Sequence, residues 1–169
     1  MKVSAVDAVS AVDMTDVELI ANDLNQAAYV AREALISKAE EIKQTYWDWW
    51  KVVNREILTA ISQGDQTKKT GRITPRIRTD KGKVIIFWEK RPRIAFGSPG
   101  SPKRSYATYI APTQRRGYTK TQLANICQSW EWQAVWDAEL KFQQVRELLD
   151  INNETLKSLR GYFKKTQSS

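Results

Sequence analysis

The sequence RITPRIRTDKGKVIIFWEK, residues 72–90, predicts a β-hairpin in the middle of a 169-residue chain. Asp80-Lys81-Gly82 is a turn signal, and the segments on either side of it have the composition of strands. Pro75 has no N–H to donate to a ladder, so the first strand belongs at a sheet edge. The second strand, from Lys83 to about Glu89, contains the run VIIFW, which is typical of a strand covered on one face.

A third strand is predicted after the hairpin. Lys103 to Ile110 alternates well enough for a strand, and the GSPGSP segment at 97–102 before it is typical of a loop. Residues 72–111 therefore predict an antiparallel meander of three strands, from which the basic loop PTQRRGYTK leads out.

Helical patterns precede and follow this predicted sheet. Apolar or small residues recur every three or four positions after a capping box at Thr15–Glu18, which predicts a helix over 15–63. The same spacing predicts a second helix over 119–165, capped by Thr119 or Thr121.

These elements predict an α+β fold in which two long helices flank a small three-stranded antiparallel β-sheet. A wide apolar arc on the second helix needs two packing partners, most simply the first helix and the sheet. We expect the two helices to run antiparallel. The predicted organisation is a single domain over 15–165, with a flexible N-terminal tail at 1–14 and a short tail at 166–169.

Composition excludes several classes of protein. The chain has no histidine and a single cysteine, Cys127, so a Cys/His zinc site and the usual histidine-dependent nucleophiles are excluded. No apolar run approaches the roughly 18 residues that cross a bilayer. We expect a cytoplasmic protein that makes no membrane contact.

Charge is concentrated in the central third of the chain. Residues 1–62, 63–120 and 121–169 carry net charges of −4, +12 and 0, which together make the formal charge of +8. The middle segment holds 15 Lys/Arg against 3 Asp/Glu. Such a block is typical of a site for a polyanion, of which nucleic acid is the commonest. The alternative is a solvated sheet face whose charges only prevent edge pairing.

The candidates for DNA contacts are the basic residues of this segment and one tyrosine. They are Arg76, Arg78, Lys81, Lys83, Lys90, Arg91, Arg93, Lys103, Arg104, Arg115, Arg116, Tyr118 and Lys120. Strand alternation places Arg76 and Arg78 on one face, and the hairpin turn brings Lys81 and Lys83 beside them.

Aromatic residues are interleaved with this basic segment. Trp88, Tyr106, Tyr109 and Tyr118 either stack on bases, as in single-strand binders, or pack the sheet against the helices. Trp47 points away from the apolar side of the first helix, so it either contacts the C-terminal helix or forms an exposed partner-binding site.

The sequence predicts no catalytic residue, no metal site and no cofactor. Only Asp65, Asp80 and Glu89 are acidic within the basic third, and a metal-dependent nuclease needs carboxylates that converge on its ion. We therefore expect a protein that is not an enzyme, and a nuclease acting through Glu89 stays a lesser alternative.

Short motifs follow one another along the chain: Tyr46-Trp47, Ile86-Phe87-Trp88, Lys90-Arg91-Pro92-Arg93, Tyr109-Ile110, Gly117-Tyr118, Trp130-Glu131 and Val145-Arg146. From about residue 38 to 165, this series resembles the MobI family of conjugative transfer proteins. The GSPGSP segment departs from the family pattern, and the first 37 residues match nothing in it. The resemblance implies an auxiliary factor that helps a relaxase act at the origin of transfer.

Two functions from different classes follow from these patterns. The leading hypothesis is a DNA-binding component of a relaxosome whose basic sheet grips the origin of transfer, while its long helices dimerise or engage the relaxase. The alternative is a helical adaptor, not an enzyme, whose basic face binds an acidic protein partner. An electrophoretic shift with random and origin DNA separates the two.

Overall fold

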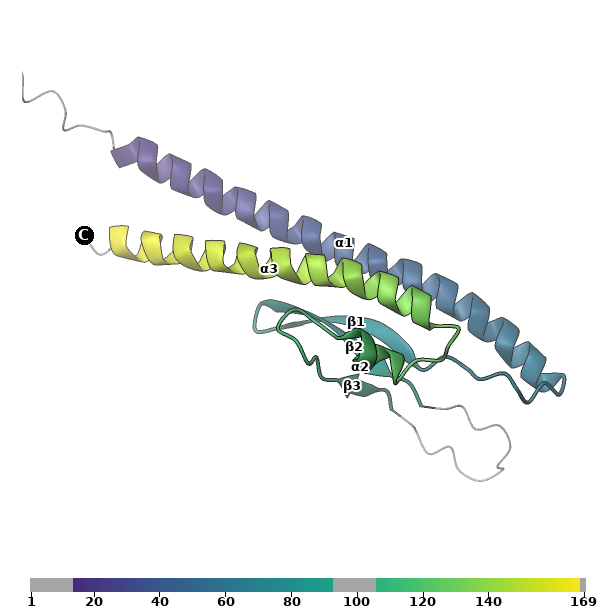
Figure 1. Cartoon of the computed structure of the whole chain (residues 1–169). Helices are drawn as coiled ribbons and strands as arrows, with labels where there is room; N and C mark the ends of the chain where they lie inside the picture. The colour runs from purple at the N-terminus through teal and green to yellow at the C-terminus, as the bar shows by residue number, and fades with distance from the viewer. Residues whose placement is uncertain (1–13, 93–105, 168–169) are drawn as a thin grey trace, which may run out of the picture. The chain divides into compact units, whose positions relative to one another are not determined.

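The computed structural model describes residues 14–92 and 106–167 of the chain. Six elements follow in order (Figure 1): α1 (Met14–Ser62), β1 (Ile73–Asp80), β2 (Lys83–Lys90), β3 (Thr108–Ile110), α2 (Lys120–Ala124) and α3 (Trp132–Thr166). A long N-terminal helix, a three-stranded antiparallel sheet and a long C-terminal helix confirm the predicted α+β fold.

The β1–β2 hairpin has the predicted turn. Asp80 pairs with Lys83, and the two residues between them, Lys81 and Gly82, have φ angles of 48° and 80°. Positive φ at both central positions gives a tight turn that matches the twist of the strands, and glycine adopts it without steric cost. The strand order β1-β2-β3 places Pro75 on an edge strand, as predicted.

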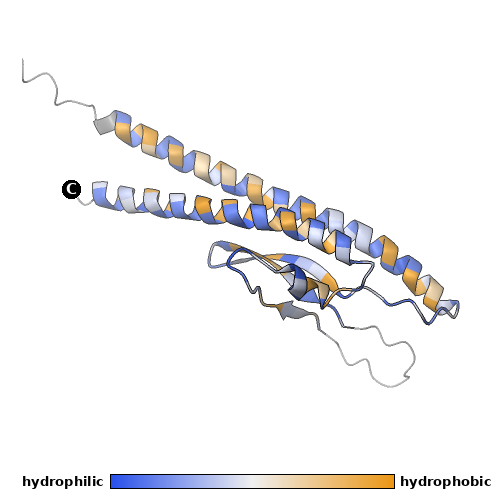
Figure 2. Ribbon diagram, in the orientation of Figure 1, coloured by the Kyte–Doolittle hydropathy of each residue, from blue (hydrophilic) through white to orange (hydrophobic). Residues whose placement is uncertain are grey.

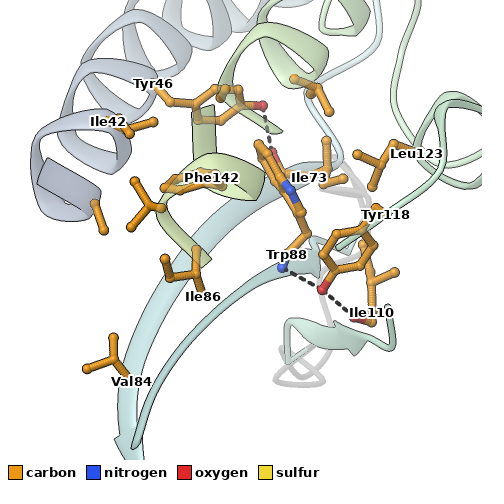
Figure 3. Packing of buried hydrophobic residues seen from close by; sticks show 14 of the residues in the cluster. Ile42, Tyr46, Ile73, Val84, Ile86, Trp88, Ile110, Tyr118, Leu123 and Phe142 are labelled. Atoms are coloured by element: carbon orange, nitrogen blue, oxygen red, sulfur yellow. Dashed lines mark hydrogen bonds between the residues drawn. The ribbon is translucent and has the colours of Figure 1, made fainter. Parts of the chain in front are cut away.

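The inner face of the sheet forms the core with the helices. Ile73, Ile86 and Trp88 are buried there against Tyr46 of α1 and Phe142 of α3 (Figure 3). Trp88 meets Tyr46 edge-on at 5.2 Å and Phe142 at 6.0 Å between ring centroids. One large aromatic side chain from the central strand therefore joins both helices to the sheet.

Two predicted elements differ from those observed. Strand β3 has only three residues, and those before Tyr106, including the GSPGSP segment, lie outside the described part of the chain. The predicted helix over 119–165 is two helices, of which α2 has the predicted cap at Thr119. The break lies where Glu131 turns inward and accepts N–H groups from Gln128, from Arg72 and from Ile73 at the start of β1, so the chain leaves the helical path before α3.

The chain divides into two compact units. We call residues 35–149 the sheet unit, and residues 14–34 with 150–167 the two-helix unit, after its described residues. Within the two-helix unit, Asn152 Nδ2 donates to the Ala28 carbonyl at 2.9 Å, and Ala21, Ala28 and Leu156 are buried. A polar residue bonded across two helices fixes their register.

Candidate nucleic-acid interface

The outer face of the sheet carries the arginines that the sequence places together. Residues paired across antiparallel strands point to the same face, and Arg76 pairs with Phe87 while Arg78 pairs with Ile85. Lys83, at the turn end of β2, belongs to the same set, and Lys81 lies in the turn itself. Arg76, Arg78 and Lys83 are all exposed. The prediction that these side chains share one face is therefore confirmed.

Aromatic rings lie among these arginines on the outer face. The guanidinium of Arg78 lies 5.3 Å from the ring centroid of Phe87, and Phe87 meets Tyr109 edge-on at 5.2 Å. Phe87 is buried beneath this arrangement, but Tyr109, which pairs with Glu89 on this face, is 49% exposed. The face thus offers an open tyrosine ring beside positive charge, which is the chemistry that binds single-stranded nucleic acid.

Arg76 is partly neutralised on this face. Its Nε lies 3.4 Å from Glu89 Oε2, and the Arg76 side chain remains 55% exposed. An exposed ion pair of this kind contributes little to stability, so the guanidinium can exchange Glu89 for a phosphate at low cost.

Arg91 lies at the end of the same face, where α1 meets the sheet. Its Nε donates to Thr74 Oγ1 at 3.1 Å, and its guanidinium lies 4.8 Å from the ring centroid of Trp47. Partial burial lowers the pKa of Arg91; Glu89 opposes this shift and Arg76 adds to it. Trp47 itself donates to the Pro75 carbonyl at 3.3 Å. The sequence predicts that Trp47 either contacts the C-terminal helix or forms an exposed partner-binding site. Its hydrogen bond is instead to β1 of the sheet.

Among the described residues, the remaining basic candidates have contacts or positions away from the outer face. Arg116 pairs with Glu147 at 2.8 Å, and Lys120 lies 5.3 Å from the ring centroid of Trp136, so both are held against α3. Arg115 is exposed in the preceding loop, and Lys90 is exposed but has the alternation of the inner face. Three further candidates, Arg93, Lys103 and Arg104, lie outside the described residues.

Tyr118 is placed inside the protein rather than in an open loop. It is 1% exposed, and its hydroxyl accepts the Trp88 N–H at 3.2 Å and donates to the Ile110 carbonyl at 2.7 Å (Figure 3). It therefore bridges β2 and β3, and burial raises its pKa to about 12. A ring in this position has no open face on which a base could stack, so the interface proposed below omits Tyr118.

A buried carboxylate on α3, Glu139, anchors the inner face of the sheet. Glu139 is fully buried, pairs with Arg146 through both oxygens at 2.9 and 3.2 Å, and accepts Trp88 Nε1 at 2.8 Å. Arg146 also donates to the Ile86 carbonyl of β2 at 3.1 Å. The paired charges and the central strand are thus fixed together. The sequence signal for this pair is an acidic and a basic residue seven apart, on the face of the helix that is otherwise apolar.

A second buried carboxylate fixes the start of β1. Glu131 accepts the N–H of Arg72 at 2.8 Å and the indole N–H of Trp50 at 2.8 Å. Burial raises the pKa of Glu131, and these hydrogen bonds act in the opposite direction. Gly71 leaves room for this contact, because a Cβ there would clash with Trp50 and Glu131. Sequence reasoning took Trp130-Glu131 only as a family motif and missed this role.

The described part of the chain lacks a cluster of metal-ligating side chains. No group of three or more His, Cys, Asp or Glu side chains gathers there to hold a metal ion. Burial raises the pKa of the Cys127 thiol to about 11, and the negative charge of Glu131 adds to this effect. No helix among the described residues combines the length and the apolar character needed to cross a membrane.

Comparison with known proteins places the chain in a family. No curated protein and no solved structure matches it significantly. The family model described as MobI protein matches residues 35–160. That interval contains the whole sheet, its outer face and both buried carboxylates, and it confirms the resemblance drawn from the short motifs. The chain therefore belongs to the MobI family, which makes it a mobilisation protein of conjugative transfer.

Proposed function

We propose that this protein is a DNA-binding accessory factor, not an enzyme, which assists the relaxase at the origin of transfer. Its DNA contacts come from the outer face of the sheet, which we define as Arg76, Arg78, Lys81, Lys83, Arg91 and Tyr109. Membership of the MobI family indicates the process, which is conjugative transfer. The outer face carries the positive charge that suits DNA binding.

The observation that carries this proposal is the exposed row of positive charge on a rigid strand. Arg76 and Arg78 are two residues apart, so their side chains point to the same side at steps of about 6.6 Å. Lys83 extends the row along the neighbouring strand. Guanidinium groups bind phosphate oxygens through paired hydrogen bonds, and a strand holds them at a fixed spacing.

The exposed ring of Tyr109 favours a DNA strand whose bases are accessible. Tyr109 packs edge-on against Phe87, so its ring is positioned from below while 49% of its surface stays open. Stacking on aromatic rings needs unpaired bases, whereas phosphate contacts alone suit either form of DNA. The outer face therefore favours locally melted DNA, such as a relaxase needs at its nick site.

The test is the affinity for origin DNA across a range of salt concentrations. Arg76→Ala/Arg78→Ala should weaken binding of an origin oligonucleotide and reduce the steepness of the log–log salt plot by about 2, because two phosphate contacts are lost. The matched control is Lys38→Ala/Lys157→Ala, which removes two charges from exposed ion pairs with Glu41 and Glu154 and should leave binding unchanged. Equal affinity for both double variants would overturn the proposal.

A second arm separates the accessory role from its alternatives. Added to purified relaxase and origin DNA, the protein should increase the nicked fraction, and Tyr109→Ala should reduce that increase. Absence of any DNA shift at low salt would favour the adaptor that binds an acidic protein. Cleavage by the protein alone with Mg²⁺, abolished in Glu89→Gln, would contradict a role without catalysis.

A further inference from the structure

The two-helix unit has its large and small apolar residues in the reverse of the usual places. On α1, the residues buried against α3 are Ala21 and Ala28, at 8% and 7% exposure. The larger side chains of the same segment are open to solvent: Leu19, Ile20 and Val30 are each 60% exposed and Leu24 is 55% exposed. A helix that buries alanine and exposes leucine and isoleucine is typical of a surface that another helix covers.

The exposed residues are arranged as a seam. Val17, Ile20, Leu24, Ala27 and Ala31 follow one another at steps of three, four, three and four residues, which is the spacing of a heptad repeat. Every member of this seam is exposed. It runs beside the buried row of Ala21 and Ala28, and apolar residues recur along this part of α1 (Figure 2). The helix therefore has one buried row of alanines and, beside it, a second row of exposed apolar residues.

Charge indicates what covers the second seam. In the described two-helix unit, the α1 segment 14–34 has four acidic residues and one basic residue, a net charge of −3. The α3 segment 150–167 has two acidic and four basic residues, a net charge of +2. A second copy of the same chain would bring a basic α3 segment to an acidic α1 segment, and would do so twice under two-fold symmetry.

We propose that the two-helix unit is a homodimerisation module, in which the seam of α1 packs against the same unit of a second copy to form a four-helix bundle. Burying Val17, Ile20, Leu24, Ala27 and Ala31 in both copies, together with the residues that flank them, would remove an area on the order of 1,000 Å², which reaches the lower limit for a specific interface. The module contains none of the residues that define the outer face of the sheet, so the proposal does not depend on DNA binding.

The test is the mass of the full chain in solution, measured by light scattering or sedimentation at micromolar concentration. The wild-type chain should have the mass of a dimer. Leu24→Asp places a charge in the seam and should give a monomer whose helical circular dichroism and unfolding midpoint in dilute solution are retained. Asn22→Asp is the matched control: it adds the same charge within the same turn on a different side of the helix, and it should remain a dimer.

Each outcome decides the proposal. A monomeric wild-type chain at 100 μM would overturn it and would leave the seam to a different protein. A dimeric Leu24→Asp would also overturn it, because the interface would then lie elsewhere. If Leu24→Asp fails to fold, Ile20→Gln and Val17→Gln serve instead, since these two members of the seam are 60% and 41% exposed. Arg76→Ala/Arg78→Ala should remain a dimer, so a failure of the DNA proposal is distinguishable from a failure of this one.

Discussion

The inner and outer faces of the sheet share the same two strands but are built from opposite interactions. On the inner face, Trp88 is fully buried and its indole donates to Glu139, a carboxylate that is also fully buried. On the outer face, Arg76 is paired with Glu89 across 3.4 Å while more than half of its side chain is open to solvent. The inner charges are satisfied by the protein, whereas the outer ones are available to a ligand.

This difference teaches how one small sheet can hold both a core and a binding surface. Removing the partner of a buried charged group strongly lowers the free energy of unfolding, whereas removing one member of an exposed ion pair changes it little. Substitutions on the inner face should therefore act on folding, and those on the outer face should act on binding with folding retained. The following variants test that separation.

Glu139→Ala should have the largest effect. It leaves the Arg146 guanidinium without its counter-charge, and it leaves the Trp88 indole and the Tyr118 N–H without an acceptor. We expect a loss of about 3–5 kcal/mol in the free energy of unfolding, measured by urea denaturation. The matched control is Glu147→Ala, which removes an exposed partner of Arg116 from the same helix and should cost less than about 1 kcal/mol. Similar losses for the two variants would contradict the distinction between the faces.

Gly117→Ala should have the next largest effect. Gly117 has φ of 150°, and a Cβ there would clash with Glu139 Oε1 and Arg146 Nη1. We expect a loss of at least about 2 kcal/mol, because the clash displaces the buried ion pair. Gly161→Ala offers a control of opposite sign: it lies within α3 with open space around it, and alanine there should stabilise the chain by about 0.5–1 kcal/mol. A harmless Gly117→Ala would show that the buried pair tolerates movement.

Tyr118→Phe should have a smaller effect on the same network. It keeps the buried ring and removes only the hydroxyl that bridges Trp88 and Ile110. The expected loss is about 1–2 kcal/mol, since a buried N–H loses its acceptor. DNA affinity should be unchanged, measured on protein that is fully folded. Weaker DNA binding by this folded variant would mean that Tyr118 contacts DNA after all.

The smallest effect is expected at Cys127, which packs against the core cluster of the sheet unit. Because burial raises its thiol pKa from 9.0 to about 11, the thiol in the folded chain should alkylate at pH 8 roughly tenfold more slowly than in urea-unfolded protein, since the smaller thiolate fraction outweighs the greater nucleophilicity of a thiolate of higher pKa. The pKa is higher in the folded state, so the associated stability is present below about pH 9 and is lost as the pH rises through 11. Iodoacetamide trapping with mass spectrometry measures the rate. Equal rates in both states would show that the thiol is not protected.

The hairpin and its two faces could be predicted from the sequence because the signals are local. Asp80-Lys81-Gly82 defines the turn, the turn defines the register, and the register puts Arg76 and Arg78 on one face. The position of Tyr118 could not be predicted in this way. Arg115, Arg116 and Lys120 of the same basic loop are exposed, whereas Tyr118 is buried by contacts with β2, β3 and α3 that its local sequence does not indicate.

The break between α2 and α3 was missed for a similar reason. The apolar spacing continues through residues 125–131, so a local pattern predicts one helix. Glu131 interrupts it through hydrogen bonds to Arg72 and Trp50, which lie 59 and 81 residues away along the chain. The break is therefore associated with long-range hydrogen bonds to a buried carboxylate, which the local spacing of apolar residues does not reveal.

The most direct test of the two-faced sheet measures DNA affinity and unfolding free energy on one variant, Arg76→Ala/Arg78→Ala. We predict that the free energy of unfolding stays within about 1 kcal/mol of the wild-type value, because both side chains are exposed. We predict that affinity for origin DNA falls by about tenfold or more at 100 mM salt. Unchanged affinity in this folded variant would contradict the assignment of the outer face to DNA.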